Sequence, residues 1–292
     1  MSITDSSLSR FIFEDAPIRG EFTHVGEAWR TMLAQHDYPS TLKGLLGELV
    51  AASALLAATL KLRGSLILQI QGNGPISLLV VECTGDLKMR ATAKWKGDLP
   101  HARLADLVGE GSFVITLDPK DGNQTYQGIV PLEGDSVAEA LQNYMTRSEQ
   151  LETRLWLAAD STCVGGMLLQ KMPEREAKDE DAWNRIGQLA ATLTPNELLE
   201  LPAPDILHRL FHEEDIRLFE AQEVRFECTC SRDSVTGMLR MLGHDEIRSI
   251  VEEQGRVEVH CEFCNQRYEF DPVDAEQVFA STIKIPGSEA KH

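Results

Sequence analysis

Four cysteines near the C-terminus constrain the fold of this chain more than any other feature. They form two close pairs, Cys228-Thr229-Cys230 and Cys261-Glu262-Phe263-Cys264, with thirty residues between the pairs. Two such pairs, each supplied by a turn of the chain, can surround one Zn²⁺ ion tetrahedrally. We therefore expect a small C-terminal domain whose folding depends on a bound metal ion.

The spacing within the first cysteine pair is unusual for a purely structural site. Cys261 and Cys264 have the common Cys-x-x-Cys spacing, whereas only one residue separates Cys228 from Cys230. A structural zinc ribbon is the simplest interpretation, and a zinc site that also responds to oxidation is the alternative. If the four thiols were oxidised, three disulfide pairings would be open to them.

The N-terminus and the most apolar stretch indicate where this chemistry takes place. Residues 1–6 lack the basic start and the apolar run of a signal peptide. The stretch from Leu49 to Leu60 has twelve residues, too few to cross a bilayer, and predicts a buried helix. We expect a soluble cytoplasmic protein with no membrane partner. In a reducing cytosol, clustered cysteines are typically metal ligands or redox sensors.

The charge of the chain argues against a nucleic-acid partner. The formal net charge is -18, and residues 223–292 contribute 14 acidic and 8 basic residues. A zinc module that binds nucleic acid usually needs a basic face to displace counterions from phosphates. The sequence also has no Ser-His-Asp, Walker or glycosidase-like pattern. We therefore expect neither nucleic-acid binding nor an enzyme.

The length of 292 residues predicts two domains joined by a linker. Residues 1–173 are typical of an α+β domain with a largely antiparallel sheet, because aliphatic stretches alternate with turn residues. The turn at Gly72-Asn73-Gly74-Pro75 leads into a strand and not a helix, so it is no phosphate loop. The expected strands are Ser65–Gln71, Ile76–Cys83, Ser112–Leu117, Tyr126–Pro131, Thr153–Ala158 and Gly166–Lys171, and the expected helices are Leu42–Lys61 and Ser136–Arg147.

Residues 174–222 form an acidic segment, with 12 acidic and 5 basic residues, which we interpret as a helical linker. It opens with a charge run from Glu174 to Asp181. Thr194-Pro195-Asn196-Glu197 is a capping box that starts a helix ended by Pro202, and a further helix is expected from Asp205 to His212. Helices this short depend on tertiary packing, so the linker should be metastable and fold only against another surface. The apolar residues available for that packing are Trp183, Ile186, Leu189 or Ala190, Leu193, Leu198, Leu199, Leu210 and Phe211.

Several other residues carry weaker signals. Cys83 and Cys163 lie in or beside predicted strands and are typical of small buried hydrophobic residues. His208 and His212 stand four apart on one helix face, but no carboxylate accompanies them at the spacing of a zinc protease. His260 borders Cys261 and is a candidate competitor for zinc, although four cysteines already complete a site.

The cysteine motifs carry a resemblance to a known family. Phe226-Glu227-Cys228-Thr229-Cys230-Ser231-Arg232 and Val257-Glu258-Val259-His260-Cys261-Glu262-Phe263-Cys264 closely resemble those of the bacterial redox-regulated 33 kDa heat-shock chaperone (33 kDa chaperonin) family. The resemblance extends over essentially the whole chain. Its other matching stretches are Ile18–Glu21, His36–Pro39, Leu68–Pro75, Tyr126–Val130, Arg147–Leu151 and Gly165–Gln170.

The resemblance implies an ATP-independent holdase that is inactive when reduced and loaded with one zinc ion per chain. In that family, oxidation forms two local disulfides, here Cys228-Cys230 and Cys261-Cys264, releases zinc and unfolds the linker. The active form, often a homodimer, then binds unfolding client proteins under oxidative and heat stress. The resemblance assigns the metal and switch roles to the four cysteines within residues 223–292. Ser231-Arg232-Asp233-Ser234 departs from the more usual Ser-Arg-Glu-Arg, which affects charge near the thiolates but not ligation.

Two alternatives from other classes remain open at the level of sequence. The first is a constitutive zinc-stabilised protein-binding module in which the four cysteines are merely structural. The second is a thiol oxidoreductase that uses Cys261 and Cys264 as a catalytic dithiol. The second alternative requires a thioredoxin-like βαβ setting, which the predicted elements do not supply.

Overall fold

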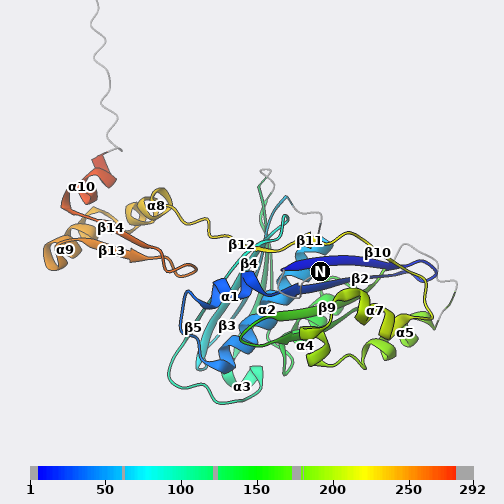
Figure 1. The fold of residues 1–292 in the computed structure, drawn as a ribbon. Coiled ribbons are helices and arrows are strands. Elements are labelled where there is room, and N and C mark those ends of the chain that lie inside the picture. Colours follow the sequence, from blue (N-terminus) through cyan, green and yellow to red (C-terminus); the bar gives the residue numbers. More distant parts are fainter. Residues whose placement is uncertain (1–5, 61–62, 121–123, 173–178, 180, 281–292) are drawn as a thin grey trace, which may run out of the picture. The chain divides into compact units, whose positions relative to one another are not determined.

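The computed structural model describes residues 6–60, 63–120, 124–172, 179 and 181–280 (Figure 1). Residues up to Glu227 form one compact unit, and residues from Cys228 form a second. Each unit has a hydrophobic core of its own. Most of the predicted charge run from Glu174 to Asp181 lies outside the described residues.

The first unit contains two six-stranded sheets. In the first sheet, all pairings are antiparallel and the strand order is β10-β1-β2-β9-β8, with β11 also paired to β1. Its strands are β1 (Ser7–Phe13), β2 (Ile18–Val25), β8 (Thr153–Ala159), β9 (Val164–Lys171), β10 (Ile216–Leu218) and β11 (Gln222–Glu223).

The second sheet has the order β12-β5-β4-β3-β6-β7 and is antiparallel except where β12 runs parallel to β5. Its strands are β3 (Gly64–Gly72), β4 (Ile76–Thr84), β5 (Lys88–Trp95), β6 (Gly111–Pro119), β7 (Tyr126–Pro131) and β12 (Arg225–Phe226). The predicted turn at residues 72–75 joins β3 to β4, so the prediction of a strand after this turn is confirmed.

A long apolar helix, α2 (Ser40–Thr59), packs against strands of both sheets and fills the larger core. Among the described residues it is the one helix long and apolar enough to span a membrane, but 72% of its apolar window is buried inside the protein. Such burial is what a core helix shows, and it confirms the predicted buried helix. The other helices around this core are α1 (Glu27–Leu33), α3 (Leu104–Val108) and α4 (Val137–Arg147).

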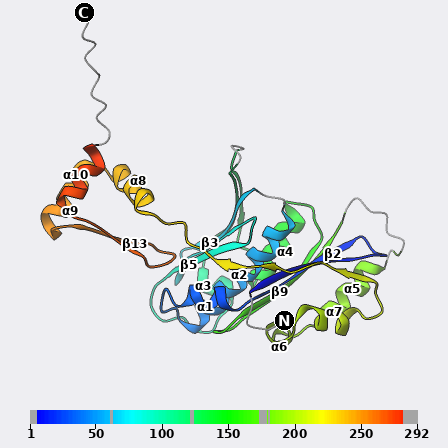
Figure 2. The same cartoon turned by 45° about the horizontal axis from the view of Figure 1, so that its top comes forward.

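Three short helices cover the other face of the first sheet (Figure 2). They are α5 (Ala182–Ala190), α6 (Pro195–Glu200) and α7 (Ala203–Phe211), and we call them the linker helices. The capping box predicted at Thr194 is present, with the Glu197 carboxylate accepting from Thr194 and the Thr194 hydroxyl accepting from the Glu197 amide. The linker helices and the turn between α5 and α6 bury Ala182, Ile186, Ala190, Leu193, Leu198, Ala203, Ile206, Leu207, Leu210 and Phe211 against the sheet.

The predicted strands and helices of the α+β domain are confirmed, with ends that differ by one or two residues. Leu189 is 37% exposed, and Ala190 takes the buried position of that helical turn. Strands β1, β2 and β5 were not among the predicted elements. Strand β2 escapes a prediction from sequence because it contains Gly20 and Glu21, two residue types that are uncommon in strands. Here both lie in a strand that is buried on both faces.

The second unit is small. It contains α8 (Arg232–Leu242), α9 (His244–Gln254), the hairpin β13 (Val257–His260) and β14 (Arg267–Phe270), and α10 (Pro272–Ala280). Its core consists of Val235, Leu239, Ile247, Val257, Phe270, Ala275 and Val278. A core of this size supplies little stability, and small domains commonly gain more from an additional restraint such as a metal ion.

Glu21 makes the stability of the first unit depend on pH. Its side chain is 2% exposed, and burial raises its pKa to about 7, against the lowering effect of Arg19 and Arg10. Its Oε2 atom has no hydrogen-bond partner among the described residues. The folded state therefore holds a proton that the unfolded chain releases above about pH 4.3, so this carboxyl group lowers stability as pH rises from about 4 to 7.

We expect Glu21→Gln to raise the free energy of unfolding at pH 8 by up to about 3 kcal/mol and to leave it nearly unchanged at pH 4. Glu48 on α2, whose pKa burial also raises to about 7, should retain its own share of the pH dependence. Urea denaturation of the reduced protein at several pH values measures the effect. The exposed Glu110→Gln variant is the matched control, and an unchanged pH slope in Glu21→Gln would contradict the assignment.

Candidate metal and redox centre

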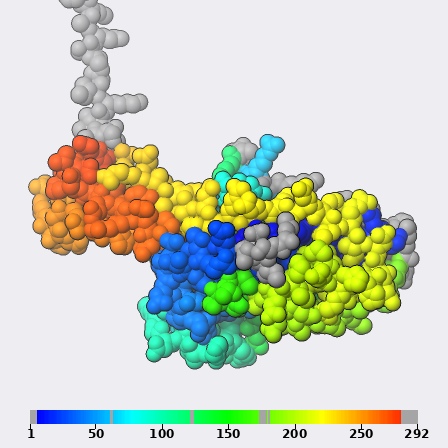
Figure 3. All heavy atoms as spheres, in the orientation of Figure 1, coloured from blue at the N-terminus to red at the C-terminus, as the bar shows by residue number. Residues whose placement is uncertain are grey.

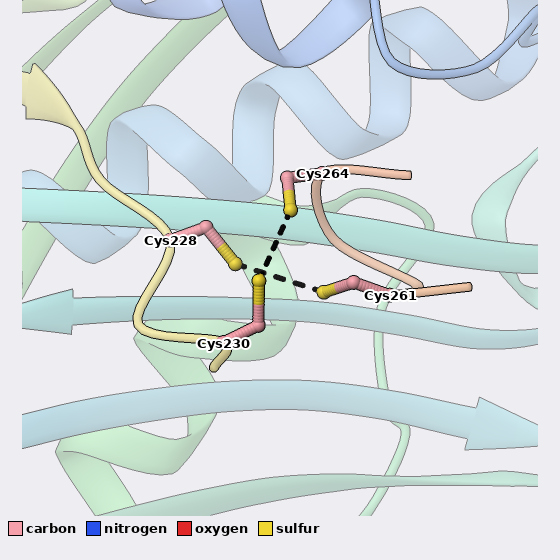
Figure 4. A group of neighbouring side chains, drawn as sticks. All are labelled: Cys228, Cys230, Cys261 and Cys264. Atoms are coloured by element: carbon pink, nitrogen blue, oxygen red, sulfur yellow. Dashed lines mark hydrogen bonds between the residues drawn. The ribbon is translucent and has the colours of Figure 1, made fainter. Parts of the chain in front are cut away.

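The four cysteines predicted as ligands converge in the second unit (Figure 4). Cys228 and Cys230 lie in the segment that leads into α8, and Cys261 and Cys264 lie in the turn between β13 and β14. All four are partly buried and none is in a disulfide. Their sulfur atoms lie within 4.8 Å of one another.

The sulfur positions fit one tetrahedral zinc ion. A Zn–S bond of about 2.3 Å places the sulfur atoms of a regular tetrahedron roughly 3.8 Å apart. The Sγ atoms of Cys228 and Cys261 are 3.7 Å apart, and those of Cys230 and Cys264 are 3.3 Å apart. Both of these contacts join one cysteine pair to the other, which is the arrangement expected of a shared metal ion.

Local backbone structure holds each cysteine pair in place. Ser231 caps α8 through its hydroxyl, which accepts from the Ser234 amide at 3.1 Å, so the helix begins directly after Cys230. In the second pair, the Asn265 amide donates to the Cys261 carbonyl at 2.8 Å, and the Cys261 amide donates to the Gln266 carbonyl at 3.0 Å. Asn265 adopts a positive φ of 53°, a conformation that Asn tolerates better than most residues.

Two residues with no role predicted from the sequence support the centre. The Tyr268 hydroxyl donates to the Cys230 sulfur at 3.1 Å, so a residue of β14 contacts the first cysteine pair. Arg232 lies 4.2 Å from the Phe270 ring, pairs with Asp274 at 2.7 Å and donates to the Glu269 carbonyl. Arg232 thus joins the start of α8 to β14 and α10. Neither residue has a sequence spacing that identifies it, because both act across the hairpin.

Burial disfavours free thiolates in this cluster. Desolvation raises the pKa of the Cys264 thiol above its ordinary value, and the neighbouring thiols raise it further. Four thiols this close do not ionise together without a cation to offset their charge. The donor set is therefore suited to a soft divalent metal ion that binds thiolates, and Zn²⁺ is such an ion.

The linker helices are held on the first sheet by specific polar contacts. The Arg154 guanidinium of β8 lies 4.7 Å from the Trp183 ring and contacts the backbone of Gly187, where any Cβ atom would collide with it. The Leu199 carbonyl at the end of α6 accepts from His24 Nε2 at 3.0 Å and from the Cys163 thiol at 3.6 Å. These contacts place the linker in one position on the sheet.

Comparison with known proteins agrees with these features. The Hsp33 protein family model matches residues 6–271. The 33 kDa chaperonin of Methylobacillus flagellatus is 55% identical over the whole of both chains. The chain belongs to the Hsp33 family. The 33 kDa chaperonin of Chromobacterium violaceum is 53% identical, over 98% of this chain and 97% of its own.

The fold of this Hsp33-family chain also matches a solved structure. The crystal structure of the 33 kDa chaperonin (heat shock protein 33 homolog) from Thermotoga maritima aligns with a TM-score of 0.84 at 24% identity, covering 96% of this chain and 99% of that one. The match supports the α+β fold with its antiparallel sheets. The family model and the two chaperonin relatives confirm the resemblance found in the sequence.

The structure also places the other residues of this Hsp33-family chain that carried weaker signals in the sequence. Cys83 is fully buried in β4, and Cys163 is 8% exposed, as predicted for both. Burial raises the pKa of each thiol above its ordinary value. His208 on α7 and His212 directly after this helix are exposed, and His260 bonds to Glu258 at 3.1 Å. Within the described part of the chain, the four cysteines are the only cluster suited to a metal ion.

Proposed function

We propose that this protein is a redox-regulated, ATP-independent chaperone of the holdase type, and not an enzyme. Cys228, Cys230, Cys261 and Cys264 would hold one Zn²⁺ ion per chain in the reduced state. When bound, the ion joins the two cysteine pairs and neutralises their thiolates. The three functional parts would be residues 1–173, the linker 174–222 and the zinc domain 223–292, as the sequence predicts.

One observation carries the proposal: a single layer of short helices covers an apolar face of the first sheet. Phe11, Phe13 and Phe22 from the sheet are buried beneath Ile206 and Phe211 of the linker helices and their neighbours. A holdase needs apolar surface that is hidden at rest and exposed on activation. Undocking α5, α6 and α7 would expose both the sheet face and the apolar faces of the helices themselves.

The oxidation step is a two-electron reaction at each cysteine pair. The Cys228 and Cys230 thiolates would form one S–S bond and the Cys261 and Cys264 thiolates a second, losing four electrons in total. Two molecules of peroxide accept these electrons and are reduced to four hydroxide ions, and the thiolates no longer bind the metal ion. Neither disulfide joins one pair to the other, so the small unit would lose the link that its core cannot replace.

The partners follow from the same proposal. Clients would be unfolded or partly unfolded proteins, bound through apolar contacts during oxidative and heat stress. The active form would be a homodimer, acting in the cytoplasm, where a reducing environment keeps the four cysteines out of disulfides at rest. The net charge of -18 would keep the opened protein in solution. We expect neither a nucleic-acid nor a membrane partner.

The decisive experiment follows three quantities on one sample. Reduced, zinc-loaded protein is treated with peroxide at elevated temperature, and zinc release, helicity and suppression of client aggregation are measured together. We expect zinc release, loss of helix and protection of clients to rise together and to reverse with a thiol reductant. Peptide mapping by mass spectrometry should find the bonds Cys228-Cys230 and Cys261-Cys264.

Each alternative function predicts a different result in this experiment. Oxidised protein that has lost zinc but protects clients no better than reduced protein would refute the holdase. Zinc that resists the oxidant would favour a constitutive zinc-stabilised binding module. Catalytic disulfide turnover without client protection would favour a thiol oxidoreductase.

A further inference from the structure

The segment that leads to the cysteines is the outer strand of both sheets. We call residues 216–227 the strap. Its first part, β10 and β11, pairs antiparallel with β1, and its last part, β12, pairs parallel with β5. Figure 3 shows the strap (yellow) lying along the blue N-terminal strand. One extended segment therefore covers an edge of each sheet.

The strap is held largely through its backbone. The Phe219 amide donates to the Arg10 carbonyl at 2.8 Å and the Val224 amide to the Ser6 carbonyl at 3.0 Å. On the second sheet, the Glu227 amide donates to the Met89 carbonyl at 3.0 Å. Bonds of this kind do not depend on side-chain identity, so another extended chain can make them equally well.

Few side chains of the strap contribute to its position. Val224 is 2% exposed and joins the larger core, and Phe226, two residues later on the same side, packs partly against it. The strands themselves have three, two and two residues. The Glu227 carboxylate pairs with Lys88 at 3.0 Å, but both side chains are substantially exposed, and such pairs stabilise little. Val224 is thus the only fully buried residue of the strap, and the strands that pair it with the sheets are short.

The edges beneath the strap are suited to an extended polypeptide. Without the strap, β1 and β5 would present unpaired amide and carbonyl groups, which readily pair with another strand. A groove of about 600 Å³ is lined by residues of the strap, among them Val224 and Phe226, and by Ser6, Ala28 and Thr31. The groove provides space for the side chains of a segment that takes the place of the strap.

We propose that these edges of β1 and β5 are a client-binding site, which takes an extended segment of unfolded polypeptide by strand addition. This inference rests on the proposed holdase function and names how part of the client is bound. The strap ends at Glu227 and Cys228 follows it directly, so unfolding of the four-cysteine unit frees the end of the strap. The preferred segment is about ten residues long, is free of proline and carries apolar residues two apart, as Val224 and Phe226 are.

A peptide with the sequence of residues 215–227 provides the direct test on the full-length protein. Binding of the fluorescent peptide is followed by anisotropy, and its competition with an unfolded client is measured in the oxidised state. We expect it to bind oxidised protein at least tenfold more tightly than reduced, zinc-loaded protein and to displace the client. The matched control is the same peptide N-methylated at the Phe219 and Val224 amides, which keeps every side chain but loses two of the backbone donors.

A variant separates this site from the redox step. Val224→Asp places a carboxylate in the core and should release the strap, so the reduced, zinc-loaded variant should bind the peptide as oxidised protein does. Gln222→Asp, at an exposed strap position, should behave like the unchanged protein. Equal binding of the two peptides, or peptide binding that leaves the client in place, would overturn the proposal. Absence of client binding by the oxidised protein would instead refute the holdase function, and peptide anisotropy still reports on the edges in that case.

Discussion

Removal of zinc under reducing conditions should unfold the second unit and leave the first unit folded. A four-cysteine site contributes on the order of 10 kcal/mol to the folding of a small domain, because the metal ion binds the folded arrangement and not the disordered chain. The seven buried residues of this core cannot replace such a contribution. Cys261→Ser should have the same effect, since it removes one ligand and leaves three.

Circular dichroism and amide hydrogen exchange measure this outcome. Protection should be lost from α8, α9 and α10 and from the β13–β14 hairpin, whereas α2 and the central strands should stay protected. His260→Ala is the matched control, because His260 adjoins Cys261 but bonds to Glu258. This variant should retain one zinc ion per chain. A folded second unit after complete chelation would contradict the metal dependence.

Displacement of the linker helices should activate the protein without oxidation. Gly165 of β9 faces α6 so closely that a Cβ atom would lie 2.3 Å from the Leu198 carbonyl oxygen, a backbone atom that cannot rotate away. Gly165→Val should therefore undock α6 and weaken the bonds that His24 and Cys163 donate to Leu199. We expect the reduced, zinc-loaded variant to suppress client aggregation at roughly a tenth of the concentration that reduced unchanged protein requires.

The adjacent glycine provides the control for this variant. Gly166 faces the opposite side of the sheet, where a Cβ atom would meet the Leu55 side chain at 2.9 Å. Gly166→Ala should lower stability modestly and leave the reduced protein inactive, with the linker resistant to proteolysis. Equal activation by both variants would mean that general destabilisation exposes the client-binding surface. If the linker of Gly165→Val is readily proteolysed but the reduced variant remains inactive, undocking of the linker helices does not suffice for activity, and the prediction is wrong.

Much of the fold could be predicted because the signals are local. The strands around the turn at residues 72–75, the capped helix that starts at Pro195 and the buried helix α2 each follow from a pattern within a few residues. The prediction that the short linker helices need a partner surface also followed from their length alone. That this surface is one face of a sheet built partly from β1 and β2 depends on strand pairing between distant segments.

In the candidate metal centre, too, some residues could be predicted from local sequence and others could not. The four cysteines were identifiable from spacing, since thiolate pairs are the donors that zinc prefers. Tyr268 and Arg232 were not, because their contacts with Cys230 and Phe270 form only when β14 lies beside the start of α8. The contacts of Gly165 with Leu198 and of Gly187 with Arg154 likewise appear only when the linker is docked.

The sequence by itself determined the chemistry available to this protein: four thiols in two pairs suited to a soft metal ion, a short-helix acidic segment beside them, and the motifs of the Hsp33 family. Tertiary structure decided what those parts cover. The strap mixes apolar and polar residues in equal number, its paired strands have only two or three residues, and no local pattern marks it as the edge of two sheets. Ligand chemistry resides in single side chains, whereas an edge strand is defined by the partner strand it pairs with, which here lies more than a hundred residues away in sequence.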